Sequence, residues 1–345
     1  MRLQLTVPGL LWSAESLREA TRDLDLPALS TLLGRGEHRL AAAQGLTDWI
    51  ARTFSLGDDE IPWGALRRLG ETDFAPDDGA WLCADPVHVR FARDTLVLAD
   101  ARELAIAPDE ARALVESLNA HFADVGRFCV SDPARWYLCL PAAPALRTQP
   151  PERVLGRSFE PFLPEGADAG RWRALLNEAQ MLLHGHPVNA AREARGQPAI
   201  NSLWFWGAGS LPAMQAPPFG EVRSDNPLVI GAARAAGLAC APLPERAPAT
   251  VPAQGMLAVI DTLQGAAAWR DLSTWRGALA QLEREWFAPL LGALQAGGLR
   301  ELTLAAPGDE ATLELVVTAH DRWKLWRRPL ALRDLAGELS GAGLP

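Results

Sequence analysis

Residues 186–209 read HPVNAAREARGQPAINSLWFWGAG, and this segment says more about the fold than any other part of the chain. Its second half, Asn201–Gly207, is rich in bulky apolar side chains and predicts a buried strand. Gly207 and Gly209 permit a tight turn directly after that strand. Ligands of α/β proteins bind at the carboxyl ends of strands, so the turn is a candidate ligand site.

Polar side chains in the first half of this segment indicate what such a site could hold. Arg192 and Arg195 are suited to clamp a phosphate or carboxylate, although a solvated pair at a helix end fits equally well. His186 and Asn189 either order the loop or contact a ligand. His184 and His186 form an HxH pair, but the sequence offers no third ligand in reach, so a metal is not expected there.

Outward from this segment, strand-like and helical patterns alternate. Strands are expected at 2–7, 256–260 and 301–305, and amphipathic helices at 108–122 and 272–294. Strands that alternate with helices predict a mostly parallel sheet with helices on both faces.

Two segments, 71–79 and 141–151, are rich in proline or in acidic residues and glycine, and they indicate boundaries. We therefore expect an α/β core made of residues 1–75 and 155–345. A smaller α+β module, residues 78–150, is expected to interrupt it.

Composition excludes several classes of function. The net charge of -9 argues against a nucleic-acid partner, because binding phosphates needs a basic face. The start of the chain does not have the pattern of a signal peptide, and no stretch approaches the roughly 20 apolar residues of a membrane-spanning helix. We therefore expect a cytoplasmic protein without a membrane partner. The basic run Lys324–Arg328 (KLWRR) is either a contact surface or an ordinary solvated edge.

The segment at 186–209 resembles the cofactor-independent phosphoglycerate mutases of the archaeal type. That family carries an HPxN-type loop, an arginine and a strand reading N-x-x-W-x-W-G-x-G, which this chain matches at eight positions: His186, Asn189, Arg192, Asn201, Trp204, Trp206, Gly207 and Gly209. Segments 26–36, 81–140 and 258–294 resemble the same family in the same order. The chain looks closer still to the proteobacterial regulatory proteins of the RpfE type.

The resemblance implies a fold and a ligand site. The fold is an alkaline-phosphatase-like α/β core, with a mostly parallel sheet flanked by helices and a smaller inserted α+β module. The implied ligand is a small phosphorylated or carboxylated molecule. The residues implied to bind it are His186, Asn189, Arg192, Asn201, Trp206, Gly207 and Gly209.

The family's chemistry uses two divalent metals, held by Asp and His at strand ends, and a hydroxyl nucleophile. The first Asp should follow the first strand, where this chain has Pro8 and Gly9. Asp261 and Asp309 remain near two ligand positions, and His320 lies near a third. Such remnants cannot hold two metals, so we expect no cofactor. Mn²⁺ or Zn²⁺ would bind only if the chain is active with rearranged ligands.

The nucleophile should lie near residues 45–49, which read GLTDW. Thr47 is a weak candidate for that role. The alternative interpretation is that Thr47 caps a helix that begins at Asp48 or Trp49.

Three functions follow as hypotheses. The first is a catalytically degenerate relative that binds a small ligand or a protein partner in a regulatory role. The second is an active 2,3-bisphosphoglycerate-independent mutase, or a phosphatase, with rearranged ligands. The third is a purely structural interaction protein. Missing metal ligands favour the first and third, whereas the preserved polar loop at 186–209 favours the first. The most informative observation for choosing among these hypotheses is whether Asp48, Asp261 and Asp309 converge in one cleft.

Overall fold

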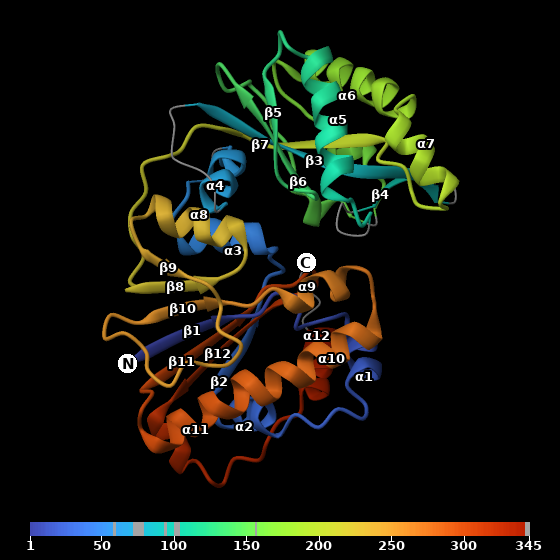
Figure 1. The fold of residues 1–345 in the computed structure, drawn as a ribbon. Helices are drawn as coiled ribbons and strands as arrows, with labels where there is room; N and C mark the ends of the chain where they lie inside the picture. Colours follow the sequence, from blue (N-terminus) through green and yellow to red (C-terminus); the bar gives the residue numbers. More distant parts are fainter. Residues whose placement is uncertain (58–59, 72–78, 93–94, 100–103, 156, 342–345) are drawn as a thin grey trace. The chain divides into compact units, whose positions relative to one another are not determined.

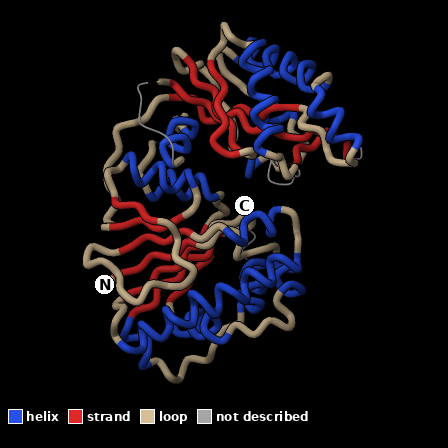
Figure 2. Tube along the Cα trace, viewed as in Figure 1, coloured by secondary structure: helices blue, strands red, loops and turns tan. Residues whose placement is uncertain are grey.

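The computed structural model describes residues 1–57, 60–71, 79–92, 95–99, 104–155 and 157–341. The chain folds into two compact units, shown in Figures 1 and 2. The first unit is formed by Met1–Ser55 with Gln215–Pro345, and the second by Leu56–Met214.

The first unit is built on a seven-stranded sheet in the order β2-β12-β11-β1-β10-β8-β9. Its strands are β1 (Arg2–Thr6), β2 (Glu37–Ala41), β8 (Glu221–Ser224), β9 (Ala239–Ala241), β10 (Met256–Val259), β11 (Glu301–Ala306) and β12 (Thr312–Thr318). The five strands from β11 to β9 run parallel, whereas β12 pairs antiparallel with both β11 and the edge strand β2. A mostly parallel sheet was expected and is present, but the sequence pattern did not indicate the antiparallel edge.

Helices cover both faces of this sheet (Figure 1). They are α1 (Ala14–Ala20), α2 (Pro27–Arg35), α3 (Leu46–Thr53), α8 (Pro227–Ala235), α9 (Thr262–Ala268), α10 (Leu272–Leu282), α11 (Ala288–Ala296) and α12 (Leu335–Gly341). The helix expected at 272–294 is present as α10 and α11, joined by a π-helical turn at Glu283–Phe287. Among the described helices, none has the length and apolar character needed to cross a bilayer.

The alternation of side chains along each strand divides the sheet into two faces. Leu3, Leu5 and Leu304 point to the face whose core also holds Trp275 and Leu290, from α10 and α11. The opposite face lies under α3 and α8, which contact each other (Figure 1). Both faces are therefore buried, as a mostly parallel sheet requires.

The second unit contains a five-stranded sheet with helices against it. Its elements are α4 (Trp63–Gly70), β3 (Ala80–Ala92), β4 (Thr95–Ala99), α5 (Pro108–His121), β5 (Arg127–Asp132), β6 (Arg135–Leu140), α6 (Ala169–His184), α7 (Pro187–Ala194) and β7 (Ser202–Gly209). The long strand β3 pairs antiparallel with β4, β6 and β7. Helices α5 and α6 pack on one face, through Leu114, Trp172 and Leu176.

The boundaries of the units differ from the predicted ones. The predicted core includes residues 155–214, yet these residues belong to the second unit, where β7 pairs with β3 and Phe205 lies opposite Ala84. A strand joins whichever sheet edge pairs its backbone groups, and a hydrophobic pattern does not identify that edge. The predicted junction at 75–78 lies outside the described residues.

A close backbone contact fixes α2 in the first unit. A Cβ atom at Gly34 would lie 2.9 Å from Leu330 N and from Pro329 Cα, and closer still to the carbonyl oxygen of Arg328. Real Cβ atoms do not approach backbone that closely, so this helix position requires glycine. The contact also holds the segment at 328–330 against α2.

We predict that Gly34→Ala destabilises the protein by about 3 kcal/mol, because the added methyl group must displace backbone. Gly292→Ala, inside α11 with no atom within 4 Å of the new Cβ, is the matched control. That change should be neutral or stabilising by up to about 1 kcal/mol, since alanine favours the helix. Denaturant unfolding measures both. Equal stability of the two variants would contradict the contact.

Candidate functional site

The carboxyl edge of the first unit's sheet brings together the residues proposed for metal binding, except one. Strands β1, β10 and β11 run parallel, so Pro8, Asp261 and Asp309 follow their strands at the same edge. Strand β2 ends there too, because it pairs antiparallel with β12. The chain then leads into α3, and Gln44 N–H donates to the carbonyl oxygen of Gly308 at 3.1 Å.

His320 is the exception, and its predicted place beside Asp261 and Asp309 is wrong. Strand β12 runs antiparallel to β11, so its last residue, Thr318, lies opposite Glu301, the first residue of β11. His320 follows Thr318 in the 3-10 turn Ala319–Trp323. It therefore lies at the amino edge of the parallel strands, a full strand length away from the two aspartates.

Two acids at the carboxyl edge, Asp261 and Asp48, form hydrogen bonds within the protein. Asp261 Oδ2 accepts a hydrogen bond from Asn226 Nδ2 at 2.8 Å. Asp48 Oδ2 accepts from the backbone N–H of Gly45 at 3.3 Å. Among the described residues, no three His, Cys, Asp or Glu side chains form a group that could hold a metal ion. The residues present therefore do not fit a two-metal centre.

Helix α3 begins earlier than predicted. Its first residue is Leu46 and its N-cap is Gly45, so it does not begin at Asp48 or Trp49. Thr47 is a buried residue of the first turn and is not the cap. The predicted capping role is therefore wrong, because glycine supplies the extended conformation at the helix start and Asp48 binds its N–H.

The turn after β1 leaves no room for an acidic side chain at position 9. Gly9 has φ +80°, and a Cβ there would lie 2.8 Å from Gln264 Cα in the first turn of α9. Its carbonyl oxygen accepts a hydrogen bond from Trp275 Nε1 at 2.8 Å. The neighbouring position is Pro8, whose side chain has no ligand atom.

The structure also places the polar side chains of 186–209. His186 is the N-cap of α7, where its Nδ1 accepts from Val188 N–H at 3.2 Å. Its Nε2 lies 2.9 Å from Ser117 Oγ. Burial lowers the pKa of His186, which favours the neutral ring.

Asn189 and Asn201 bind backbone groups. Asn189 donates to the carbonyl oxygens of Leu183 and Ile200, at 2.7 and 2.8 Å, and accepts from Ile200 N–H at 2.8 Å. Asn201 exchanges hydrogen bonds of 2.7 and 2.8 Å with the backbone of Val89. Both side-chain amides therefore supply hydrogen bonds that these backbone groups would otherwise form with other backbone groups.

Arg192 is fully buried. Its Nη1 pairs with Glu110 Oε2 at 2.5 Å, Nε donates to the carbonyl oxygen of Pro198 at 2.9 Å, and Nη2 donates to that of Leu104. The predicted solvated pair is therefore wrong for Arg192, because its guanidinium is buried and binds groups of the protein. Arg195 is half exposed and pairs with Glu110 Oε1 at 2.6 Å.

An open pocket of about 390 Å³ adjoins this loop. Its lining combines small apolar side chains with two carboxylates and one guanidinium: Ala105, Ala107, Asp109, Glu110, Val188, Ala191, Arg195 and Gln197. The two carboxylates would repel an anionic ligand, and the positive charge of Arg195 is already paired with Glu110. The pocket therefore does not suit a phosphorylated ligand.

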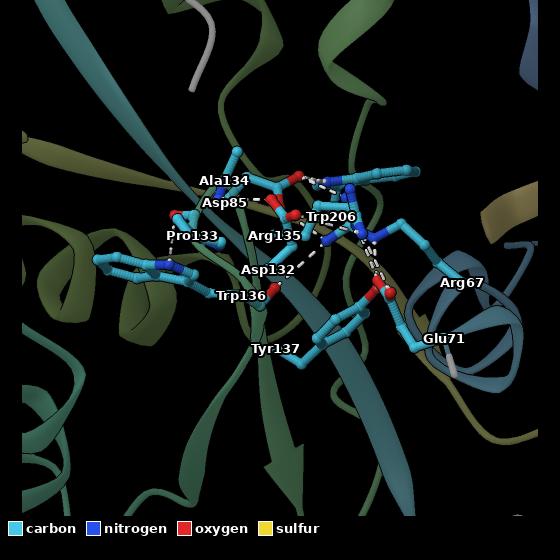
Figure 3. A network of polar contacts seen from close by, with 10 residues as sticks. All are labelled: Arg67, Glu71, Asp85, Asp132, Pro133, Ala134, Arg135, Trp136, Tyr137 and Trp206. Carbon is cyan, nitrogen blue, oxygen red and sulfur yellow. Dashed lines mark hydrogen bonds and ion pairs between the residues drawn. The ribbon is translucent and has the colours of Figure 1, made fainter. Parts of the chain in front are cut away.

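Trp206 belongs to a buried polar network that the sequence analysis missed (Figure 3). Its Nε1 donates to Asp85 Oδ2 at 2.8 Å. The Arg67 guanidinium donates to both oxygens of Asp85, at 2.8 and 2.6 Å. Arg67 also donates from Nε to Tyr137 Oη at 3.0 Å and stacks on the Trp206 ring.

The network continues toward the surface. Tyr137 Oη donates to Glu71 Oε1 at 2.6 Å, and half-exposed Arg135 pairs with both oxygens of Glu71, at 2.8 and 3.1 Å. Burial acts to lower the pKa of Arg67, but the surrounding groups, Asp85 foremost, together outweigh it and the pKa lies well above its ordinary value. Burial raises the pKa of Tyr137. Arg67 therefore stays charged and Tyr137 neutral.

The glycines after β7 serve the packing of α4. Gly207 has φ +66°, and a Cβ there would overlap Trp63 Cβ and lie 3.0 Å from Gly64 N. Gly209 has φ +152° and faces Pro62 in the same way. The turn is thus filled by the start of α4, and this explains the two glycines without a ligand.

One sequence signal could have revealed the network. Arg67 occurs in a mainly apolar helix, and Asp85 in a strand that is apolar on either side. A charge in apolar surroundings predicts a buried partner of opposite sign. The spacing of the two residues, 18 positions apart, does not by itself pair them.

The architecture defines a mixed α/β protein whose fold resembles a solved structure of an archaeal protein. The PH0037 protein from Pyrococcus horikoshii aligns with a TM-score of 0.54 and 15% sequence identity, covering 97% of this chain and 91% of that one. At that identity the likeness concerns the fold alone.

Sequence comparisons then point to a particular family. The family model for 2,3-bisphosphoglycerate-independent phosphoglycerate mutase matches residues 71–189. The mutase of that name from Methanosarcina barkeri is 30% identical over 161 residues, which are 46% of this chain and 39% of that protein. The mutase 2 from Methanothermobacter thermautotrophicus is 32% identical over 115 residues, 32% of this chain and 28% of that protein.

These matches support a protein similar to the cofactor-independent phosphoglycerate mutases, as the segment at 186–209 indicated. They span less than two fifths of the length of these curated relatives. The residues matched by the family model lie in the second unit, whereas the carboxyl edge with Asp261 and Asp309 lies in the first.

We predict that Asp85→Ala destabilises the protein by about 3–5 kcal/mol, because it leaves the buried Arg67 charge without its carboxylate. Glu165→Ala, which removes the exposed partner of Arg147, is the control and should cost less than about 0.5 kcal/mol. Urea unfolding measures both. A loss below about 1 kcal/mol for Asp85→Ala would contradict the importance of the network.

Glu110 gives a prediction about pH. Burial acts to raise its pKa, but hydrogen bonds from Ala107 N–H and the charge of Arg192 lower it below the ordinary value of 4.5. A lowered carboxyl pKa stabilises the fold above the unfolded pKa, and this contribution disappears as pH falls through the folded pKa. Glu110→Gln should therefore cost about 1–3 kcal/mol at pH 7 and progressively less below pH 4.5. A pH series of unfolding curves, with the exposed Glu178→Gln as control, tests this.

Proposed function

We propose that this chain is a phosphoglycerate mutase-like protein that does not transfer phosphoryl groups and that acts by binding a protein partner. The single observation that carries the loss of catalysis is the turn after β1. Pro8 offers no ligand atom there, and the backbone of α9 closes the space beside Gly9. Without an acid at this strand end, the edge lacks the first ligand of a two-metal site.

Two further observations support this proposal. His320 lies at the opposite edge of the sheet from Asp261 and Asp309, so these three cannot share one metal. The side chains expected to bind a phosphorylated or carboxylated ligand are bound to protein groups instead, Arg192 and Asn189 among them. A binding role for a protein surface therefore has more support than a small anionic ligand.

The finer relationships are part of the same proposal. We infer an alkaline-phosphatase-like ancestry for the first unit from the parallel strand ends that carry Asp261 and Asp309. A regulatory role, and kinship with the RpfE-type proteins, extend the resemblance of the segment at 186–209. Absence of a resident cofactor follows from the same reasoning.

An active mutase is the second candidate, because the relatives that match are named as mutases. In this chain Asp261, Asp309, Asp48 and Thr47 surround the same sheet edge. An active enzyme would need a ligand set built from these residues, and Asp261 would have to leave Asn226.

An assay of 3-phosphoglycerate conversion to 2-phosphoglycerate, with and without Mn²⁺ or Zn²⁺, separates the two candidates. We expect no metal-dependent turnover above the buffer blank, because too few ligands converge. Asp261→Asn is the matched variant, since it keeps the hydrogen-bonding shape of the side chain. Metal-dependent turnover that disappears in this variant would overturn the proposal and establish the active enzyme.

A further inference from the structure

An exposed apolar surface lies in the first unit, on the segment that follows β12. Trp323, Leu325 and Trp326, which we call the tryptophan platform, are 65%, 72% and 76% exposed. Together they present on the order of 400 Å² of apolar surface, given roughly 150–250 Å² for an aromatic side chain. Exposed apolar surface of this size within one short segment of a folded protein commonly marks an interaction site.

The segment that carries the platform is held firmly from within. Asp321 Oδ2 accepts from the backbone N–H and the Oγ1 of Thr318, at 2.6 and 2.9 Å. Its Oδ1 pairs with Lys324 Nζ at 2.5 Å. Arg322 lies over the Trp323 ring, 5.0 Å from its centroid. These contacts fix the backbone on both sides of Trp323.

The far end of the segment is fixed to α2. Arg327 Nη1 donates to the carbonyl oxygen of Gly36 at 3.0 Å, and Leu330 N–H donates to that of Ser30 at 2.9 Å. The close contact of Gly34 with the backbone at 328–330 adds to this. In Figure 1 the dark-red segment runs past α11 and α2. Side chains held outward on an ordered backbone lose little entropy when they bind.

The charge around the platform is basic, in contrast to the acidic chain. Residues 321–328 hold four basic side chains and one acid, within a chain of net charge -9. Arg328 has no ion-pair partner in the part of the chain that the structure describes. Tryptophan and arginine side by side are the residue types that dominate the binding energy of protein interfaces.

We propose that the tryptophan platform is a docking site for a protein segment in which acidic side chains flank apolar ones. The inference rests on the proposed function in that it names the class of the partner. Apolar side chains of the partner cover Trp323 and Trp326, and its carboxylates pair with Arg328 and the neighbouring basic groups. Of the two interpretations of the basic run Lys324–Arg328, a contact surface or a solvated edge, the proposal adopts the contact surface.

Other occupants fit these observations less well. A lipid surface is typically bound by the apolar face of an amphipathic helix, whereas the platform begins at the last residue of the 3-10 turn Ala319–Trp323 and continues outside any helix. A nucleic acid requires an extended basic face, and four cations beside one acid in an acidic chain do not form one. Charge complementarity therefore favours an acidic protein segment.

Two pools of fluorescein-labelled 12-residue peptides test the proposal. The positions of one pool are drawn from Asp, Glu, Leu and Phe, and those of the other from Lys, Arg, Leu and Phe. We expect the acidic pool alone to bind the full chain in fluorescence anisotropy, more weakly as salt rises. The double variant Trp323→Ala/Trp326→Ala should weaken binding at least tenfold, and Arg328→Glu at least threefold. Phe91→Ala, at an 80% exposed apolar residue of the second unit, should leave binding unchanged.

The outcomes that overturn the proposal are distinct. Absence of binding by the acidic pool, or binding that survives both the double variant and Arg328→Glu, would do so. Self-association of the chain that the double variant abolishes would assign the platform to a second copy instead. Co-sedimentation with phosphatidylserine vesicles that the double variant abolishes would assign it to lipid. The unfolding curve of each variant shows whether it is folded, and Arg328→Glu keeps both tryptophans if the double variant is not.

This experiment is independent of the mutase assay. Metal-dependent turnover would overturn the proposed function and leave the peptide result standing. Loss of peptide binding would overturn the docking site and leave the absence of catalysis standing.

Discussion

Burial of the Arg67 guanidinium is the constraint on which the second unit depends. A buried charge must have a partner of opposite sign, and Asp85 on β3 supplies it with two hydrogen bonds. Trp206 on β7 and Tyr137 on β6 complete the shell. The four residues come from one helix and three strands, so the network requires those elements to meet in one arrangement, and α4 then fills the turn that Gly207 and Gly209 leave open.

In the first unit, the direction of the strands determines which side chains lie at the same edge of the sheet. Parallel strands bring Pro8, Asp261 and Asp309 to one edge of the sheet. The antiparallel return of β12 takes His320 to the other edge. At the carboxyl edge, the carboxylates of Asp261 and Asp48 accept hydrogen bonds from groups of the protein itself. The family model for the mutases matches residues 71–189, which lie in the second unit.

Sequence patterns located many elements correctly because those elements depend on local periodicity. The helix at 108–122 and the strands at 256–260 and 301–305 are present close to their expected ends. The same patterns did not place 155–214 in the second unit, because pairing of β7 with β3 involves residues more than a hundred positions apart. They also left open whether Asn189 orders the loop or contacts a ligand. For Arg192 they left open whether the guanidinium clamps an anion or belongs to a solvated pair.

The sequence by itself indicated an α/β protein similar to the mutases, and that resemblance led us to expect a metal-binding acid at the position of Pro8. These conclusions depend on residue identity and local spacing, both of which can be read directly from the sequence. Only the tertiary structure decided that Arg67 meets Asp85, that His320 is separated from Asp261, and that Trp323 and Trp326 face solvent. Those facts depend on which strands pair and in which direction, and backbone hydrogen bonding between distant segments sets this without a local signature in the sequence.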